Sequence, residues 1–176
     1  ISELLAVASD PFKHQVTLNK GKRHGVYNGL PLLDANGIMG QVIHVSVLSS
    51  EAMLLSDPHH AIPVQINRNG LRAVALGNGE SEQLEIPHLP NNADIRKGDL
   101  LVSSGLGRRF PAGYPVAVIS RVEISPAHPY ARVTARPTAH LMSSREVLLV
   151  WPPAPEAVAE PEADVVEDPP AQEGSE

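Results

Sequence analysis

Apolar residues alternate with polar ones over short stretches along most of this chain, and turn-forming residues separate the stretches. In the clearest stretch, Ile62, Val64 and Ile66 occupy every second position, as in a strand with one buried face. Between residues 6 and 151, no apolar stripe follows the helical period of 3.6 residues over a useful length. Turn signals recur roughly every 8–12 residues. The pattern predicts an all-β protein, built as a sandwich or a barrel.

These stretches amount to about twelve short strands. A weak internal repeat divides them into two sets, because segments 26–33 and 95–102 place glycine and apolar residues at the same spacing. Two related β-barrels would produce such a repeat, and closing each sheet would remove its exposed edges. The expected strands lie at residues 6–8, 15–18, 30–33, 38–47, 51–55, 62–66, 71–76, 83–89, 100–102, 115–122, 132–135 and 146–151.

The domain boundaries depend on how the two barrels share these strands. A sequential division gives a first barrel at 6–66 and a second at 67–151. In the alternative, the final strands near 130–151 return to the first barrel, and the middle of the chain forms an inserted second barrel. Residues 152–176 differ in kind, with six prolines, eight acidic residues and no basic one. We expect them to form a disordered acidic tail, since they cannot bury enough apolar surface to offset their ordering entropy.

Composition removes several classes of function. The absence of cysteine excludes a disulfide framework, thiol catalysis and cysteine-ligated zinc. The net charge is −6, yet residues 1–151 carry 14 basic and 12 acidic groups, a net of +2. A body so close to neutral argues against a nucleic-acid binder that neutralises phosphates. No apolar run approaches the ~20 residues that span a bilayer. We expect a chain that begins at Ile1 to be part of a longer protein.

Catalytic patterns are weak. A serine hydrolase would draw its nucleophile from Ser103 or Ser104, with His44 or His59 as the base and Asp57 as the orienting carboxylate. No GxSxG elbow surrounds these serines. The eight histidines show no ligand spacing such as HExxH, so we expect no metal site. The glycine loop after residue 104 lacks the GK[ST] ending of a phosphate-binding loop, and we expect no cofactor.

The stretch from Arg96 to Val122 reads as strand, glycine loop, strand, and it carries a family resemblance. Its Lys-Gly-Asp-Leu-Leu-Val-Ser-Ser-Gly-Leu-Gly, followed by Phe-Pro-Ala-Gly and Pro-Val-Ala-Val-Ile, is similar to the signature of the rod-shape-determining MreC family. Upstream segments such as Gly37-Ile38-Met39-Gly40 agree in the family's order, so the resemblance covers roughly residues 6–150. The chain departs from the family at Ala117, where glycine is usual, and at Arg108, where glycine is frequent.

The resemblance implies both a fold and a function. The fold would be two small six-stranded β-barrels in tandem, preceded at residues 1–5 by the last turn of a dimeric coiled coil. The function would be that of a non-enzymatic scaffold of bacterial cell-wall elongation. The scaffold would lie in the periplasm, anchored to the inner membrane by an N-terminal segment that this sequence lacks. The alternative is a β-barrel hydrolase or a peptidoglycan-binding module.

Several partners follow from the same resemblance. The principal partner would be the elongation-specific penicillin-binding transpeptidase. MreD and RodZ would join the assembly directly, and the MreB filament indirectly. The chain would also form a homodimer or a higher self-assembly.

The basic glycine loop is the candidate contact surface. Arginine and aromatic residues are enriched at interface hot spots, and Pro111 stiffens this loop. In one interpretation, the loop contacts a partner or a second copy through Arg108, Arg109, Phe110 and Tyr114. In the other, Phe110, one of only two phenylalanines, folds back to fill its own barrel.

Overall fold

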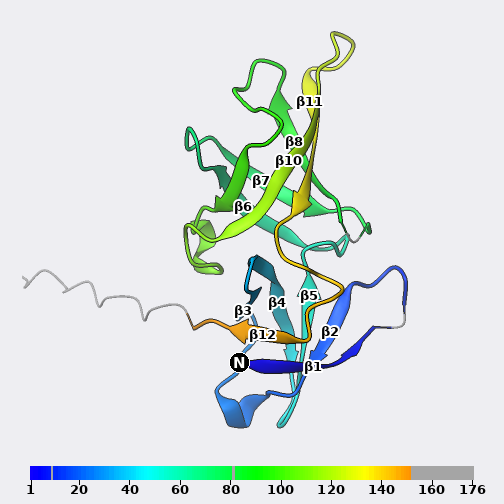
Figure 1. Ribbon diagram of the computed structural model, residues 1–176, viewed down its shortest axis with the longest axis vertical. Helices are drawn as coiled ribbons and strands as arrows, with labels where there is room; N and C mark the ends of the chain where they lie inside the picture. The colour runs from blue at the N-terminus through cyan, green and yellow to red at the C-terminus, as the bar shows by residue number, and fades with distance from the viewer. Residues whose placement is uncertain (9, 81, 152–176) are drawn as a thin grey trace, which may run out of the picture.

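The computed structural model describes residues 1–8, 10–80 and 82–151, and within these ranges the fold is all-β (Figure 1). Two short 3-10 turns, η1 (Lys22–His24) and η2 (Leu106–Arg108), interrupt the strands. The strands are β1 (Ser2–Val7), β2 (Gln15–Leu18), β3 (Pro31–Asp34), β4 (Gly37–Val45), β5 (Ser50–Leu54), β6 (Ala61–Ile66), β7 (Arg72–Gly77), β8 (Leu84–Pro90), β9 (Leu100–Ser103), β10 (Pro115–Glu123), β11 (Tyr130–Pro137) and β12 (Glu146–Leu149).

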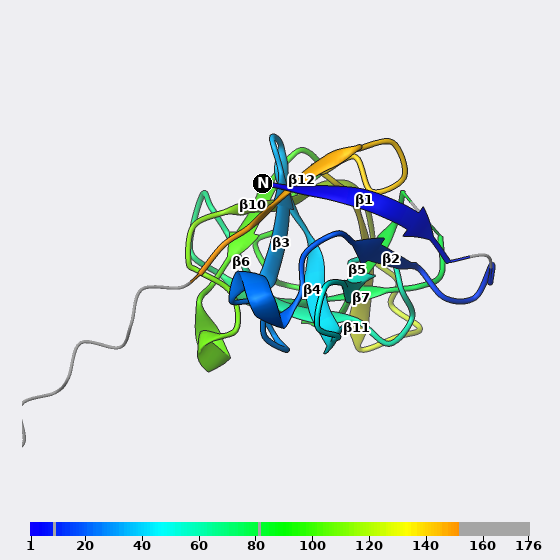
Figure 2. The same cartoon turned by 90° about the horizontal axis from the view of Figure 1, so that it is seen from below.

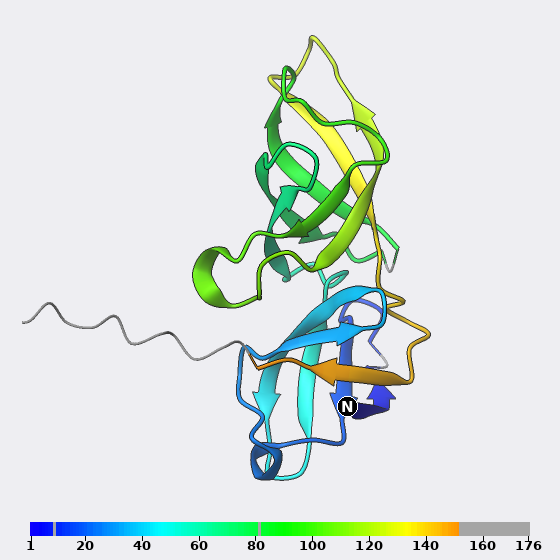
Figure 3. The same ribbon diagram turned by 60° about the vertical axis from the view of Figure 1, so that its left-hand side comes forward.

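The strands close into two antiparallel barrels of six strands each, which confirms the expected architecture. Barrel 1 has the order β1-β12-β3-β4-β5-β2, and barrel 2 has the order β10-β11-β8-β7-β6-β9. Figures 1 and 3 show the two barrels stacked along the long axis of the molecule. The expected acidic tail at 152–176 lies outside the described residues.

Barrel 1 takes strands from both ends of the described chain. β12 pairs with β1 through Ser2 and Val147 and with β3 through Leu33 and Leu148, and it thereby closes the barrel (Figure 2). The sequential division between residues 66 and 67 is therefore wrong, because β6 already belongs to barrel 2. The inserted arrangement is right, although β12 alone returns and β11 stays in barrel 2.

Residues 1–5 are not the end of a helix, so that expectation is wrong too. They form most of β1, in which Leu4 pairs with Leu18 of β2. Ser2 is buried, and its hydroxyl lies 2.9 Å from the Asn19 side-chain oxygen. Without β1, both β2 and β12 would present an unpaired edge, so closing the sheet outweighs any local helical preference.

Aliphatic side chains fill both barrels. Burial alternates along β6 and β11, as the sequence pattern predicts for strands with one inward face. Each fully buried Leu, Ile or Val contributes roughly 1.5–3 kcal/mol relative to its exposed state. The largest fully buried side chains come from both barrels: Leu18, Leu30, Leu32, Ile38, Met39, Leu54, Leu55, Ile62, Ile66, Leu84, Ile86 and Leu101.

The first passage of the chain between the barrels, residues 55–60, is held by a buried aspartate. Asp57 is fully buried, and its carboxylate accepts hydrogen bonds from the backbone N–H groups of His14 (2.9 Å) and His59 (2.8 Å). The bond from His14 ties this passage to the loop before β2. A buried carboxylate needs such donors, because an unpaired charge would be costly to bury.

The second passage, residues 138–145, is held in the same way. Asp34, at the end of β3, accepts hydrogen bonds from the backbone N–H of His140 (2.8 Å) and the hydroxyl of Ser144 (3.1 Å). The tip of the β3–β4 hairpin also packs on barrel 2, since a Cβ at Gly37 would collide with the carbonyl of Pro115 and the hydroxyl of Thr138. Two anchored passages and this contact fix one barrel against the other.

Candidate protein-binding surfaces

The glycine loop between β9 and β10 is anchored from below by Ser103. This buried serine donates its hydroxyl to the carbonyl of Pro111 and accepts a hydrogen bond from the backbone N–H of Tyr114 (3.0 Å). Gly105 and Gly107 both have φ near +75°, which only glycine adopts without strain. Arg108 follows with φ +54°, a conformation that costs a non-glycine residue about 1–2 kcal/mol. The loop therefore has a fixed shape.

Phe110 is the second anchor of the loop. Its ring is 4% exposed and packs against His60, with ring centroids 6.0 Å apart. The interpretation of Phe110 as an exposed contact is therefore wrong, and its place in the hydrophobic core agrees with the alternative, in which it folds back into the protein. The β9–β10 loop must place one apolar residue under itself, and Phe110 is its largest apolar side chain.

The other three candidate residues of this loop are exposed. Arg108 and Arg109 reach over barrel 1 and form one wall of a cleft of about 450 Å³. Tyr114 is 38% exposed and does not line this cleft. The opposite wall comes from residues 27–29 and 41–43 of barrel 1. A contact of these three side chains with a partner or a second copy stays a prediction.

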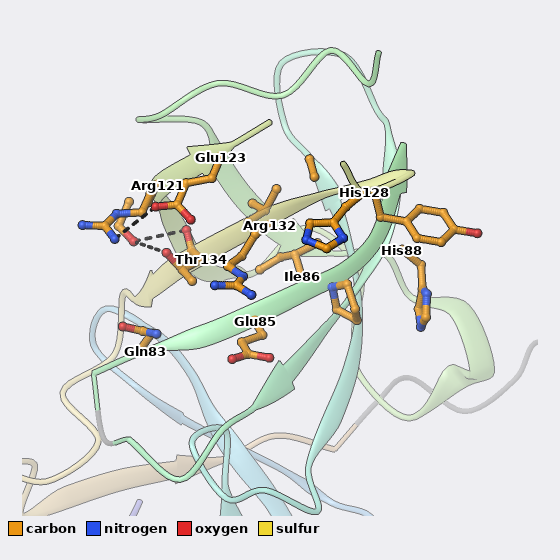
Figure 4. A pocket seen from close by; sticks show the side chains of 14 residues that line it. Gln83, Glu85, Ile86, His88, Arg121, Glu123, His128, Arg132 and Thr134 are labelled. Carbon is orange, nitrogen blue, oxygen red and sulfur yellow. Dashed lines mark hydrogen bonds and ion pairs between the residues drawn. The ribbon is translucent and has the colours of Figure 1, made fainter. Parts of the chain in front are cut away.

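Barrel 2 carries a larger groove, of about 1050 Å³, on the outer face of β8, β11 and β10 (Figure 4). Two β-bulges frame it. In β8 the pairs Ile86–Val133 and Leu89–Ala131 leave one extra residue at Pro87–His88. In β10 the extra residue is Ser120. A bulge increases the local twist of its strand, so two bulges flanking β11 hollow the sheet between them.

The groove has an aromatic end and a charged end. Figure 4 places His88 and His128 at one end. Tyr130 lies at the same end, because its ring meets that of His88 edge-on with centroids 5.7 Å apart. His88 has φ +63°, so the bulge turns it out of the regular alternation. At the other end, Arg121 contacts Glu123 at 3.3 Å. Aromatic residues and arginine are enriched at protein interfaces, and polar groups form the rim of such surfaces.

The sequence interpretation missed this groove. It treated 83–89 as a regular strand, although Pro87 sits in the middle of that stretch. A proline inside a strand removes a ladder hydrogen bond and is confined to edges and bulges. That single residue was the available signal. The bulge at Ser120 leaves no comparable trace, because serine fits an ordinary exposed strand position.

The structure does not assemble the serine-hydrolase residues. Ser103 is buried under the loop of barrel 2, whereas His44 is an exposed residue of β4 in barrel 1. His59 and Asp57 do meet at 3.1 Å, but neither is hydrogen-bonded to Ser103 or Ser104 among the described residues. Another serine, Ser56, lies 2.7 Å from Nδ1 of His14, and it is fully buried at the junction of the barrels.

Shifted pKa values occur at two places, at His60 and at the aspartates that contact Arg68. Burial lowers the pKa of His60 to about 4, although the charge of Asp57 acts in the opposite direction. On the surface of barrel 2, hydrogen bonds from Arg68 lower the pKa of Asp94 to about 2 and also lower that of Asp99. Arg68 joins these two aspartates at 2.9 Å and 3.0 Å, and so it links the β6–β7 turn to the segment before β9.

Metal and membrane features were sought over the same ranges. Residues 1–8, 10–80 and 82–151 contain no group of three or more His, Asp or Glu side chains placed to hold a metal ion. In that part of the chain, no helix has both the length and the apolar character needed to cross a membrane.

Comparison with known proteins identifies close relatives. Residues 4–151 match the family model described as rod shape-determining protein MreC, barrel core. The cell shape-determining protein MreC of Escherichia coli (strain K12) is 46% identical over 151 residues, which cover 86% of this chain and 41% of that relative. The chain thus spans about two fifths of the length of that curated relative.

Solved structures agree with the fold. The crystal structure of MreC from Pseudomonas aeruginosa superimposes with a TM-score of 0.83 and 52% identity, covering 85% of this chain and 97% of that one. A complex between penicillin-binding protein PBP2 and MreC from Helicobacter pylori matches with a TM-score of 0.58 and 22% identity, covering 77% of this chain and 83% of that one. At that identity, the second likeness concerns the fold alone.

Proposed function

The chain belongs to the MreC family of rod shape-determining proteins, and we propose that it is a non-enzymatic scaffold that binds the transpeptidase of cell-wall elongation. It works on the periplasmic side of the inner membrane, as part of a longer protein anchored there by an N-terminal segment. The wider assembly includes MreD and RodZ, with the MreB filament engaged indirectly. Self-association of the scaffold, in which Arg108, Arg109 and Tyr114 are candidate contacts, brings several such complexes together.

The groove of barrel 2 is the observation that carries this proposal. Tyr130 and Arg132 line it beside His88, and tyrosine and arginine are enriched at interface hot spots. Its volume of about 1050 Å³ leaves room for the side chains of a protein segment, and a protein of the same fold has been solved in complex with PBP2. We assign the transpeptidase contact to this groove.

The junction between the barrels supports a scaffold mechanism. Both passages of the chain are held by buried aspartates: Asp57 lies within the first passage, and Asp34 of β3 accepts a hydrogen bond from the second. A surface that is already rigid loses little conformational freedom on binding. Such a surface shifts a partner enzyme toward whichever of its conformations fits best. Activation of the transpeptidase then needs no chemistry from this chain.

A binding assay with the transpeptidase ectodomain tests the proposal. Tyr130 is 53% exposed, so Tyr130→Ala should weaken binding at least tenfold, about 1.4 kcal/mol, while leaving the fold intact. The matched control is Phe12→Ala, which removes an exposed aromatic ring from barrel 1 and should leave the affinity unchanged. Equal weakening by both variants would move the contact away from the groove.

Two further assays test the alternative functions, a peptidoglycan-binding module and a hydrolase. If the chain shows no binding to the transpeptidase at about 100 µM but sediments with purified peptidoglycan, it is a peptidoglycan-binding module. Labelling of the folded chain by a serine-directed probe would point to a hydrolase. We expect neither result.

A further inference from the structure

After β12, the last described residues of the chain lie between two basic turns, η1 and η2. The η1 turn contributes exposed Lys22 and Arg23, and the η2 loop contributes exposed Arg108 and Arg109. In Figures 1 and 3, the orange end of the chain after β12 lies between these turns, on one side of the molecule. Trp151 fixes that end, because its indole N–H donates a hydrogen bond to the carbonyl of Gly25 (3.1 Å), directly after η1.

None of these four cations takes part in an ion pair within residues 1–8, 10–80 and 82–151, so no acidic side chain there neutralises them directly. The two turns are joined by the barrel-1 wall of the Arg108–Arg109 cleft. In that wall, the backbone N–H of Gly29 donates to Val42 (2.7 Å), so its shape is fixed. The η1 turn, this wall and the Arg108–Arg109 side of the cleft therefore form one preformed, positively charged surface, which we call the basic strip.

The complementary charge lies in this chain itself. Residues 152–176 begin one peptide bond beyond Trp151 and contain eight acidic residues and no basic one. A Gly/Ser-type chain of 25 residues would have a root-mean-square end-to-end distance of roughly 25–30 Å, and proline and like charges extend a chain further, so the length of this segment is enough to reach either turn. Tethering raises the effective concentration of such a segment to roughly the millimolar range, which lets individually weak charge contacts add up.

We propose that the acidic segment 152–176 folds back onto the Arg108–Arg109 cleft and the adjoining η1 turn of the same molecule. The segment neutralises this strip and shields it from other acidic partners. The contact is reversible and salt-dependent, because it joins exposed charges. It leaves the groove of barrel 2 open, so it is independent of transpeptidase binding.

A spin label in the acidic segment tests the contact in the full chain. The protein has no cysteine, so Ala171→Cys provides a single attachment site for a nitroxide. We expect the label to broaden the amide signals of residues 22–27 and 106–109 at about 25 mM salt, and to lose at least half of that effect at about 500 mM. Unchanged signals at low salt, or broadening spread evenly over both barrels, would overturn the proposal.

Charge variants identify the docking surface. Arg108→Asn with Arg109→Ser should abolish the broadening, and asparagine suits position 108 because it tolerates a positive φ. The control, Arg132→Ser with Arg136→Ser, removes two exposed arginines from β11 and should leave the broadening unchanged. Persistence of the broadening in the first variant contradicts the assignment of the cleft.

A mixing experiment separates docking within one molecule from docking between copies. An isotope-labelled chain without nitroxide is mixed with an unlabelled chain that carries it. At a concentration where sedimentation shows the chain to be monomeric, so that copies do not meet through Arg108 and Arg109, the proposal predicts no broadening in this mixture. Broadening there would show that a second copy supplies the acidic segment, and would replace the intramolecular contact by self-association.

Discussion

The imidazole of His60 lies against the ring of Phe110, 6.0 Å between centroids, where the first passage between the barrels meets the glycine loop. Neither ring nitrogen of His60 has a hydrogen-bond partner among the described residues. An unpaired polar group in such a place costs roughly 1–3 kcal/mol. We therefore predict that His60→Leu stabilises the fold by about that amount at pH 7.5, as measured by urea unfolding.

The same substitution should change the response to acid. Because the pKa of His60 is about 4 in the folded chain and near 6.5 when unfolded, the unfolded state binds the extra proton between these values. Stability is then lost as the pH falls from 6.5 toward 4. At pH 5 the loss is about 2 kcal/mol, so the advantage of His60→Leu should grow by that amount. An advantage equal at pH 7.5 and pH 5 would contradict a neutral, buried His60.

Phe110→Ala should strongly destabilise barrel 2. The ring is buried, and truncating a buried phenylalanine costs about 3–5 kcal/mol. Phe12→Ala is the matched control, because Phe12 is 78% exposed and its loss should stay within roughly 0.5 kcal/mol. Urea unfolding of both variants measures the difference. Equally small losses of stability in both variants would show that the Phe110 side chain is exposed.

Gly37→Ala tests the contact between the barrels. A Cβ at this position meets the backbone of Pro115, which cannot turn aside as a flexible side chain can. We expect a loss of about 1–3 kcal/mol from this crowding, beyond any local backbone strain.

Gly70→Ala shows what alanine costs at a positive φ where an added Cβ meets no neighbour, although its φ differs from the +153° of Gly37. Gly70 has φ +72° and no neighbour within 4 Å of an added Cβ, so its substitution should cost only about 1–2 kcal/mol of backbone strain. Equal losses at positions 37 and 70 would mean that the hairpin tip moves freely away from barrel 2.

Asp34→Ala should loosen the second passage between the barrels. It leaves the N–H groups of Gly37 and His140 without their acceptor, which should cost about 2–4 kcal/mol. Asp10→Ala is the control, since within the described ranges the Asp10 carboxylate accepts one hydrogen bond, from the N–H of exposed Phe12, while the backbone bond from Lys13 to Asp10 survives the substitution. Small-angle scattering should also show a larger radius of gyration for Asp34→Ala alone. An unchanged radius of gyration would mean that contacts other than those of Asp34 hold the two barrels together.

The candidate site was only partly visible in the sequence. Arg108 and Arg109 were recognised as exposed cations because glycine and proline frame a turn around them. The same turn signals could not tell that Phe110, one residue further on, points inward to His60. The groove of barrel 2 escaped notice because it arises from register: bulges at Pro87–His88 and Ser120 meet across β11, far apart in the chain.

The sequence by itself determined most of the strands, the turns between them and, through the repeat and the glycine-loop signature, two barrels of one family, but it did not reveal that residues 2–5 belong to a strand. Alternation and turn chemistry are local properties, so they can be read without a partner strand. The tertiary structure decided which strands close which barrel. β12 completes barrel 1 because a sheet closes only when both edge strands find partners, here β1 and β3. That pairing joins residue 2 to residue 147, and no local pattern at either end of the chain records it.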